Sequence, residues 1–205
     1  NAATCSSTQT AVVTVNTPPN VSVNSGSICA GGNINLIAAG AVNYVWTPTS
    51  NLSPSSGANV TATPSTTSTY LVTGTDANGC SDTAYANVLV NPLPVIVANN
   101  ATICPGGSVS ITATGASSYS WSPATGLNVS NTATVIASPS VTTNYTISGT
   151  SAQGCIATKN ITVTLNTNPI FTVNNASYCA GSTNYATLTA SGTANMSYTW
   201  TPTTG

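Results

Sequence analysis

Apolar and polar residues alternate along most of the chain with a period of two. The segments 108–113 and 161–165 place Ile, Val, Leu or Ala at every second position, with Ser or Thr between them. Such alternation is typical of β-strands with one buried face, whereas an amphipathic helix needs a period of about 3.6 residues. Gly-Gly, Asn-Gly and Ser-Pro dipeptides interrupt the alternation and favour turns. The pattern therefore predicts an all-β protein built from short strands.

The six cysteines divide the chain into repeats of 75 residues, because the intervals between them alternate between 24 and 51 residues. The surrounding sequence has the same period: the motif Tyr-x-Trp-x-Pro recurs at 44–48, 119–123 and 198–202. A fixed period of this kind indicates a repeat architecture. The cysteines are Cys5, Cys29, Cys80, Cys104, Cys155 and Cys179.

About seven strands are predicted in each repeat, at intervals of about 8–12 residues and without a helical segment. This spacing favours a β-sandwich, since one coil of a β-solenoid is far shorter than 75 residues. In the second whole repeat the predicted strands are 94–99, 101–104, 108–114, 117–122, 132–138, 143–151 and 157–166.

The recurring motifs resemble those of the tandem immunoglobulin-like (Ig-like) and PKD-like repeats of Bacteroidota cell-surface adhesins and extracellular filament proteins. The likeness lies in the Ile-Cys-x-Gly opening at 28–31, the Tyr-x-Trp-x-Pro motif, Thr-Tyr at 69–70 and the Gly-Cys pair at 79–80. The resemblance implies a linear array of β-sandwich domains, export to the bacterial cell surface and a structural or adhesive role. Many members are rich in Asp, and this chain departs from them.

Proline-containing joints at 18–19, 92–94 and 169 separate the repeats, and proline keeps such short joints stiff and extended. We expect four segments: the last strand of a preceding Ig-like repeat at 1–17, whole Ig-like repeats at 18–92 and 93–167, and the first strands of a further, incomplete Ig-like repeat at 168–205.

Charged side chains are almost absent, and this excludes several classes of function. The chain contains only Asp76, Asp82 and Lys159, has no His and carries a net charge of −1. Nucleic acid is held through its phosphates by basic residues, general acid–base catalysis uses His or tuned carboxyl groups, and metal sites need clustered ligands. The composition therefore predicts a protein that is not an enzyme, with no cofactor, metal site or nucleic-acid partner. No apolar run approaches the roughly 20 residues of a membrane span.

One tryptophan in each repeat is expected in the core. Trp46, Trp121 and Trp200 occupy the middle of the repeat motif, as the buried Trp of Ig domains does. Tyr70 and Tyr145 follow a Thr-rich turn and are predicted to pack at the corner before the penultimate strand. If the Trp rings were exposed instead, they could stack on sugars, which leaves a carbohydrate-binding module as a less favoured alternative.

Two features suggest other chemistry. Asp76 and Asp82 flank a turn but have no carboxylate counterpart in the other repeats, so a calcium loop is disfavoured. Asp82-Thr83-Ala84 resembles the short O-glycosylation motif of Bacteroidota, which makes Thr83 a candidate for glycosylation.

The cysteines of an exported chain are expected to form disulfides. One scheme closes each repeat, through Cys29–Cys80 and Cys104–Cys155. If strands alternate in direction, however, these partners lie at opposite ends of a domain, tens of ångströms apart, whereas a disulfide needs Cα atoms within about 7 Å. We therefore prefer an inter-domain Cys29–Cys155 bond, with the closed-repeat scheme and free or interchain thiols as alternatives.

The sequence thus predicts a structural, non-catalytic segment of a long secreted cell-surface protein that forms an extracellular fibre, sheath or surface layer. Its expected partners are other copies of itself, in lateral or end-to-end assembly, because a nearly neutral surface favours association. Glycans or host and environmental surfaces are further candidate partners. The alternative function is the stalk of a giant bacterial adhesin that presents a distal binding tip.

Overall fold

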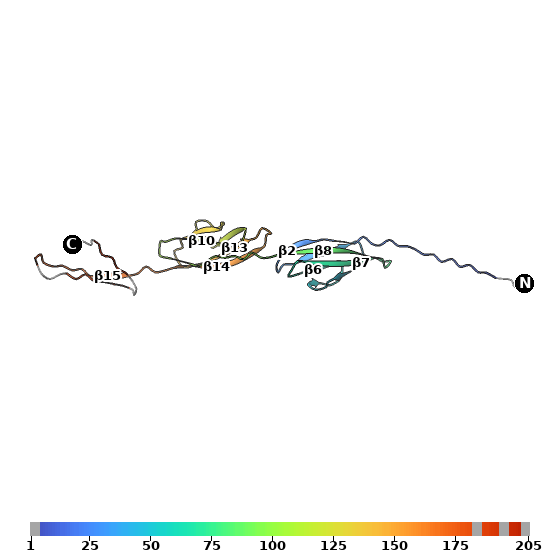
Figure 1. Ribbon diagram of the computed structural model, residues 1–205, viewed down its shortest axis with the longest axis horizontal. Coiled ribbons are helices and arrows are strands. Elements are labelled where there is room, and N and C mark those ends of the chain that lie inside the picture. Colours follow the sequence, from blue (N-terminus) through green and yellow to red (C-terminus); the bar gives the residue numbers. More distant parts are fainter. Residues whose placement is uncertain (1–4, 182–185, 193–196, 202–205) are drawn as a thin grey trace. The chain divides into compact units, whose positions relative to one another are not determined.

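The computed structural model describes residues 5–181, 186–192 and 197–201, and every regular element in these ranges is a β-strand (Figure 1). Across the described residues no helix is long and apolar enough to cross a membrane. The chain contains two compact units. The first comprises residues 1–94 with Thr150–Ile156, and the second comprises residues 95–149 and 157–205.

The first unit is a sandwich of two four-stranded sheets. One sheet has the order β1-β3-β6-β5, and the other has the order β2-β8-β7-β4. The first sheet consists of β1 (Ser22–Val23), β3 (Ile34–Ala39), β6 (Asn59–Ala62) and β5 (Leu52–Ser53), and the second consists of β2 (Gly26–Cys29), β8 (Ser81–Asn91), β7 (Ser68–Thr75) and β4 (Asn43–Thr47).

This strand order is that of an Ig domain. With β1, β3, β6 and β5 as strands A, B, E and D, and β4, β7 and β8 as strands C, F and G, the two sheets are the ABED and CFG sheets of the constant-type Ig fold. The additional strand β2 pairs with the open edge of β8. The predicted all-β, Ig-like sandwich is therefore confirmed by the topology itself.

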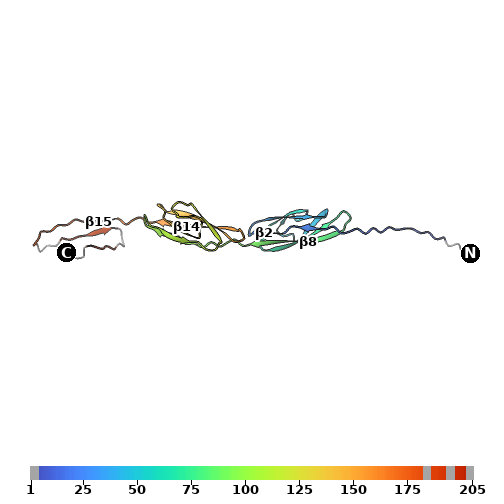
Figure 2. The same ribbon diagram turned by 90° about the horizontal axis from the view of Figure 1, so that it is seen from above.

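Strand β2 lies beside β8 (Figure 2). It runs parallel to β8, and the register places Cys29 opposite Asn91 at the end of β8. The expectation that all strands alternate in direction is wrong at this edge. The chain passes from β1 in one sheet to β2 in the other through Asn24 and Ser25, and this switch lets β2 continue in the direction of β8. The same parallel pairing joins β9 to β14 in the second unit.

The second unit repeats this arrangement. Its sheets have the orders β11-β13-β14-β9 and β10-β12. The strand predicted at 94–99 is reduced to one bridge between Val97 and Thr114, while the other six predicted strands are present with both ends within two residues of those expected. They are β9 (Ala101–Ile103), β10 (Val109–Thr112), β11 (Ser118–Ser122), β12 (Thr134–Ala137), β13 (Thr143–Thr150) and β14 (Ile156–Leu165).

Short segments flank the two sandwiches. Residues 5–20 contain no strand, and Val12, Val13 and Val15 in this segment are exposed. Beyond residue 168, β15 (Phe171–Val173) pairs with β16 (Ala190–Gly192). This pair corresponds to β1 and β3 of the first unit, which are the strands that open a repeat.

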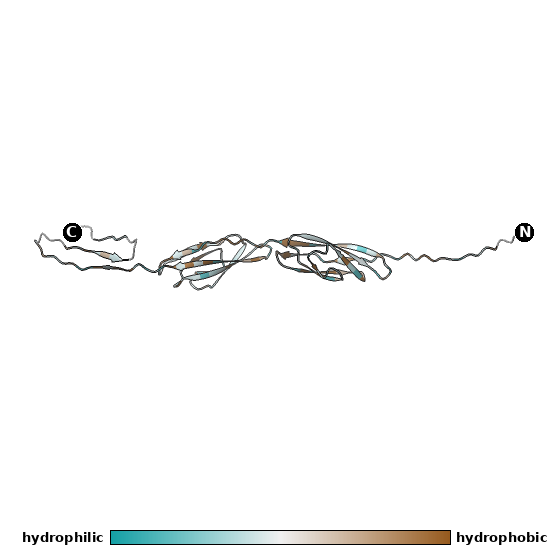
Figure 3. Ribbon diagram, turned by 90° about the horizontal axis from the view of Figure 1, so that it is seen from below, coloured by the Kyte–Doolittle hydropathy of each residue, from teal (hydrophilic) through white to brown (hydrophobic). Residues whose placement is uncertain are grey.

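Each sandwich is held by a core of alternating residues from its facing sheets (Figure 3). In β7, Tyr70, Val72 and Gly74 are buried while the residues between them are partly exposed. Trp46 of β4 pairs with Val72 and is fully buried. Its indole N–H donates to the Gly57 carbonyl at 2.9 Å, which satisfies the only polar atom that its burial removes from water.

Glycine is required just after strand B of each sandwich, where the segment that enters the repeat passes close by. Gly40 and Gly115 both have φ of +99°, a conformation that other residues rarely adopt. A Cβ atom at Gly40 would overlap the carbonyl group of Asn20, and one at Gly115 would overlap that of Val95. These glycines let the segment that enters each repeat lie against the end of strand B.

Tyr145 anchors the start of β13. It is fully buried, and its hydroxyl donates to the Thr125 carbonyl at 2.8 Å. Burial raises the pKa of Tyr145 above its usual value near 10, and the hydrogen bond with Thr143, which lowers the pKa, is the smaller effect. Burial likewise raises the pKa of Tyr70.

We predict that stability falls as the pH rises above about 10, where tyrosines of the unfolded chain ionise while the buried ones resist ionisation. The folded chain holds the tyrosine protons more tightly than the unfolded chain does. Their contribution to the free energy of unfolding is therefore fully present below the pKa of an unfolded tyrosine, and it is lost as the pH rises through the higher pKa of the folded chain. Urea denaturation between about pH 8 and about pH 12 measures this fall. Tyr145→Phe should be less stable by about 1–2 kcal/mol at pH 8, because the Thr125 carbonyl loses its donor. An equally steep fall in this variant would contradict the role given to Tyr145.

Candidate functional site

The candidate site is a cysteine joint, formed by Cys29, Cys155 and Asn91. Cys29 and Cys155 are disulfide-bonded, with 5.5 Å between their Cα atoms. Cys155 is fully buried, and its Sγ lies 3.9 Å from the Asn91 carbonyl oxygen. The bond joins two successive sequence repeats, and the turn that carries Cys155 belongs to the first compact unit.

Cys29 lies in an opening turn, which we define as residues 29–32 and 104–107 in the two repeats. Gly32 N–H donates to the Cys29 carbonyl at 2.8 Å, and Gly31 has φ of +83°. The Ala30 N–H donates to the Asn91 carbonyl at 2.8 Å. These bonds fix Cys29 beside the end of β8.

Cys155 lies in a closing turn, defined as residues 76–80 and 151–155. Ser151 N–H donates to the Cys155 carbonyl at 2.8 Å, and Cys155 N–H donates to Ser151 Oγ at 3.1 Å. Gly154 has φ of +80°, as a tight turn requires. The closing turn therefore presents its cysteine directly before the last strand of the repeat.

The two cysteines of one repeat are too far apart to bond. Cys80 directly precedes β8, whereas Cys29 lies opposite Asn91, the last residue of this strand of 11 residues. At about 3.3 Å per residue, the ends of β8 lie roughly 35 Å apart. The alternative pairing Cys29–Cys80 is absent from the structure, and so is Cys104–Cys155, because Cys155 is already bonded to Cys29. Cys5, Cys80, Cys104 and Cys179 are free thiols here.

The two carboxylates hold separate pieces of backbone and do not converge on a site. Asp76 Oδ1 accepts hydrogen bonds from Asn78 N–H and Cys80 N–H, at 2.9 Å each. Asp82 Oδ2 accepts one from Val21 N–H at 3.1 Å. Within the described ranges, no three His, Cys, Asp or Glu side chains are grouped as metal ligands would be. In the first closing turn Asp76 accepts the hydrogen bond from the cysteine N–H, as Ser151 does in the second.

The aromatic candidates lie in two environments. Trp46 and Trp121 are 0% and 4% exposed, and Tyr70 and Tyr145 are buried beside them in the cores of the two sandwiches. Trp200 is 43% exposed, so its expected place in a core is wrong for this structure. The physical reason is that the described part of its repeat contains only β15 and β16, and no second sheet covers the ring.

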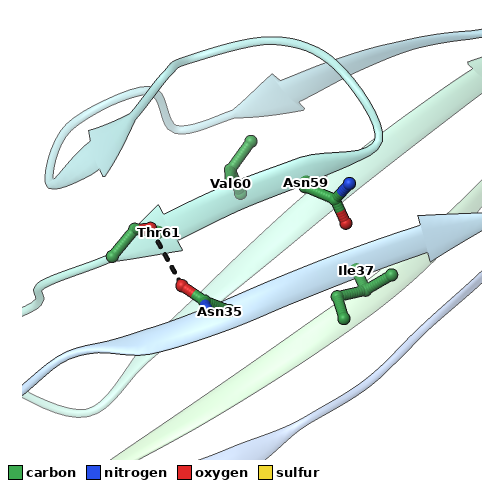
Figure 4. A pocket seen from close by; sticks show the side chains of 5 residues that line it. All are labelled: Asn35, Ile37, Asn59, Val60 and Thr61. Carbon is green, nitrogen blue, oxygen red and sulfur yellow. Dashed lines mark hydrogen bonds between the residues drawn. The ribbon is translucent and has the colours of Figure 1, made fainter.

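The outer faces of the sheets carry neutral cross-strand hydrogen bonds. On β3 and β6, Thr61 Oγ1 donates to Asn35 Oδ1 at 2.9 Å beside a shallow hollow that Ile37 and Asn59 also line (Figure 4). Thr83 is exposed on the neighbouring sheet, so its hydroxyl is accessible and the glycosylation prediction stays open. Three further Thr–Asn bonds have the same form, Thr69–Asn87, Thr146–Asn160 and Thr162–Asn144.

Sequence reasoning missed the role of the tyrosine in the Tyr-x-Trp-x-Pro motif. The Tyr44 hydroxyl donates to the Ala41 carbonyl at 2.9 Å and accepts from Ala41 N–H at 2.7 Å. Tyr119 forms the same pair of bonds with Ala116. The recurrence of Tyr two residues before Trp was the available signal, and it marks a hydroxyl that closes the turn between strands B and C.

No protein-family model matches the sequence, and no curated protein matches it. Solved structures with a similar arrangement of strands include an I-band fragment of titin, at 12% identity, which covers 86% of this chain and 77% of that chain with a TM-score of 0.41. They also include the IG1+IG2 domains of DIP-gamma, at 10% identity, with coverage of 73% and 98% and a TM-score of 0.39. The N-terminal eight Ig domains of Down Syndrome Cell Adhesion Molecule match at 15% identity, with coverage of 85% and 32% and a TM-score of 0.35.

We predict that the double variant Cys29→Ser and Cys155→Ser is less stable than the original chain by about 2–5 kcal/mol, because a disulfide between residues 126 positions apart restricts the unfolded chain. The urea midpoint measures the change. Dithiothreitol should lower the midpoint of the original chain by the same amount and leave that of the variant unchanged. A shift in the variant would show that reduction acts elsewhere.

We further predict that Asp76→Ala lowers stability by about 1–2 kcal/mol, because two backbone N–H groups of the closing turn lose their acceptor. Asp76→Ser provides the matched control, since the other closing turn uses Ser151 in this place, and it should recover most of the loss. Calcium should leave the urea midpoint of the original chain unchanged, and stabilisation by calcium would refute the structural role of Asp76.

Proposed function

We propose that this chain is a non-catalytic structural segment of a long secreted cell-surface protein that forms an extracellular fibre, sheath or surface layer. The observation that carries the proposal is the disulfide between Cys29 and Cys155, which links two successive repeats covalently instead of closing either one. A bond in this position leaves the fold of each repeat unchanged and limits how the repeats move with respect to each other. An extracellular fibre under tension requires a covalent link of this kind between its repeats.

The disulfide also supports an extracellular location. Disulfides persist in oxidising compartments and are rare where glutathione and thioredoxin keep thiols reduced. The Cys155 side of the bond is fully buried, which shields it from reductants. This argument is independent of the resemblance to bacterial surface repeats, and it leads to the same compartment.

The nearly uncharged surface supports assembly of copies. The chain carries one basic and two acidic side chains, so copies repel each other very weakly. Many sheets pair oppositely charged side chains across neighbouring strands. In this chain, Thr–Asn hydrogen bonds such as Thr61–Asn35 and Thr69–Asn87 take that place. Each bond uses the Thr proton and the Asn oxygen, so the Asn amide retains two N–H donors for a neighbouring chain.

The burial of Trp46 and Trp121 weighs against the carbohydrate-binding alternative. Rings that are 0% and 4% exposed offer no face on which a sugar could stack. Enzymatic function is disfavoured for the reason given by composition, since the two carboxylates of the chain are each engaged with backbone N–H groups at different places.

We predict that purified copies associate into multi-chain filaments or layers, and that this association changes less than about twofold between about 0.02 and about 0.5 M NaCl. Over this range the Debye length falls from roughly 20 Å to about 4 Å, which would alter any contact made by charges. Light scattering measures the association, and electron microscopy identifies its form.

Asn35→Asp is the matched control, because it keeps the shape of an exposed side chain on β3 and adds a charge. Its association should be weaker at low salt and recover as salt is added. A steep salt dependence of the original chain would contradict the proposal. Isolated thin strings without lateral contacts would favour the adhesin stalk instead.

A further inference from the structure

The opening and closing turns recur along the chain, but only one pair of them, that of Cys29 and Cys155, is joined by a disulfide in the described residues. We infer that Cys104 and Cys80 are open halves of two further joints of the same kind, each of which takes the complementary cysteine of another Ig-like repeat through a disulfide. Cys104 would take the cysteine of a closing turn, and Cys80 that of an opening turn. The inference rests on the proposed function, because it extends the covalent linkage of one pair of repeats to a series.

Cys104 has the same local structure as the bonded Cys29. Gly107 N–H donates to the Cys104 carbonyl at 2.9 Å, against 2.8 Å for Gly32 and Cys29, and Gly106 has φ of +77°. The end of the last strand lies alongside in both cases, since Asn166 N–H donates to the Ile103 carbonyl at 2.9 Å. Cys104 is exposed and free, whereas Cys29 is partly buried and disulfide-bonded.

Cys80 has the same local structure as the bonded Cys155. Its Sγ lies 3.9 Å from the Asn16 carbonyl oxygen, the distance found between Cys155 Sγ and the Asn91 carbonyl oxygen, and both pairs are 64 residues apart. Asn16 and Asn91 also precede the joints of successive repeats by the 75-residue period. The closing turn around Cys80 is therefore already set against the segment that a preceding repeat would contribute.

The contacts impose a rule on the pairing. An opening turn ends a strand that is parallel to the last strand of its own repeat, and a closing turn begins the last strand of its repeat. In the finished joint one turn of each type meets. Two opening turns would not reproduce the contact of the closing-turn cysteine with the Asn91 carbonyl, so we expect mixed pairs only.

Bond formation needs an oxidant. Two thiols lose two protons and two electrons to the disulfide of oxidised glutathione, which is cleaved to two molecules of glutathione while the new Sγ–Sγ bond forms. In the cell, a thiol–disulfide oxidoreductase of the export pathway would accept the same two electrons.

The test extends the full chain so that a further closing turn follows the last Tyr-x-Trp-x-Pro motif. Gly205 corresponds to Gly126, because each follows the repeat tryptophan by five residues. Residues 127–167 are added after Gly205, so that a second copy of the Cys155 closing turn is present. In this added copy Ile156→Val marks the cysteine peptide by its mass. The chain is oxidised in a glutathione buffer, alkylated, and digested with pepsin at acid pH, which suppresses exchange because thiolate is the attacking form.

We expect the Cys104 peptide to be joined to the mass-marked peptide, and alkylation of Cys104 to fall at least about tenfold, since a bonded sulfur is not a thiolate nucleophile. The matched control carries Cys155→Ser in the added copy only, and there Cys104 should remain fully alkylated. Alkylated Cys104 in the folded extended chain, or a Cys104–Cys179 bond, would overturn the inference.

A second extension tests Cys80 and does not depend on the first one folding. Residues 18–75 are placed before Asn1, which corresponds to Asp76 in the repeat, so that an added copy of Cys29 precedes the chain. Cys80 should then be lost to alkylation through a bond to this added cysteine, and a free Cys80 in the folded chain would overturn the inference. Both readouts are bonds in a purified chain. If these bonds form but no filaments appear, the inference about Cys80 and Cys104 is upheld and the proposed function in a fibre or layer is contradicted.

Discussion

The length of the last strand of each repeat determines which cysteines can meet. β8 and β14 span 11 and 10 residues, with a closing-turn cysteine immediately before each strand and an opening-turn cysteine beside its far end. Because a strand advances about 3.3 Å per residue, the two cysteines of one repeat are kept at opposite ends of the sandwich. A disulfide can form only where an opening turn meets a closing turn from another repeat, and Cys29–Cys155 is such a pair. The linkage between repeats is thus a consequence of strand length and of the parallel pairing of β2 with β8.

The scarcity of charge imposes a second constraint, because polar groups must be satisfied without ion pairs. The described cores contain no buried polar or charged side chains apart from the hydroxyl and indole groups of their aromatic residues. Among these groups, the Trp46 indole donates to the Gly57 carbonyl and the Tyr145 hydroxyl donates to the Thr125 carbonyl. On the outer faces, Thr hydroxyls bond to Asn amides across strands. Neutral hydrogen bonds of this kind are little affected by salt.

Much of the fold could be predicted from local pattern, since alternation and turn residues act over a few positions. Six of the seven strands expected in the second repeat are present, and Trp46 and Trp121 lie where a motif common to Ig domains places them. What sequence could not give depends on partners distant in the chain. The parallel direction of β2 follows from a switch between sheets. Trp200 is exposed because the described residues of its repeat form only β15 and β16. The recurring Tyr of the motif marks a role for Tyr44, but its partners are backbone groups of Ala41, which a sequence pattern does not identify.

The position of the disulfide separates the folding of a repeat from its linkage. In antibody domains a disulfide between strands B and F lies against the core tryptophan. Here strand B contributes Leu36 and strand F contributes Val72, two residues after the corner Tyr70, and both are fully buried. Neither core cluster includes a cysteine, so the core of each sandwich can form while the thiols are reduced. Oxidation then acts on turns that the folded sandwiches have already positioned. A chain organised in this way can fold first and be linked afterwards.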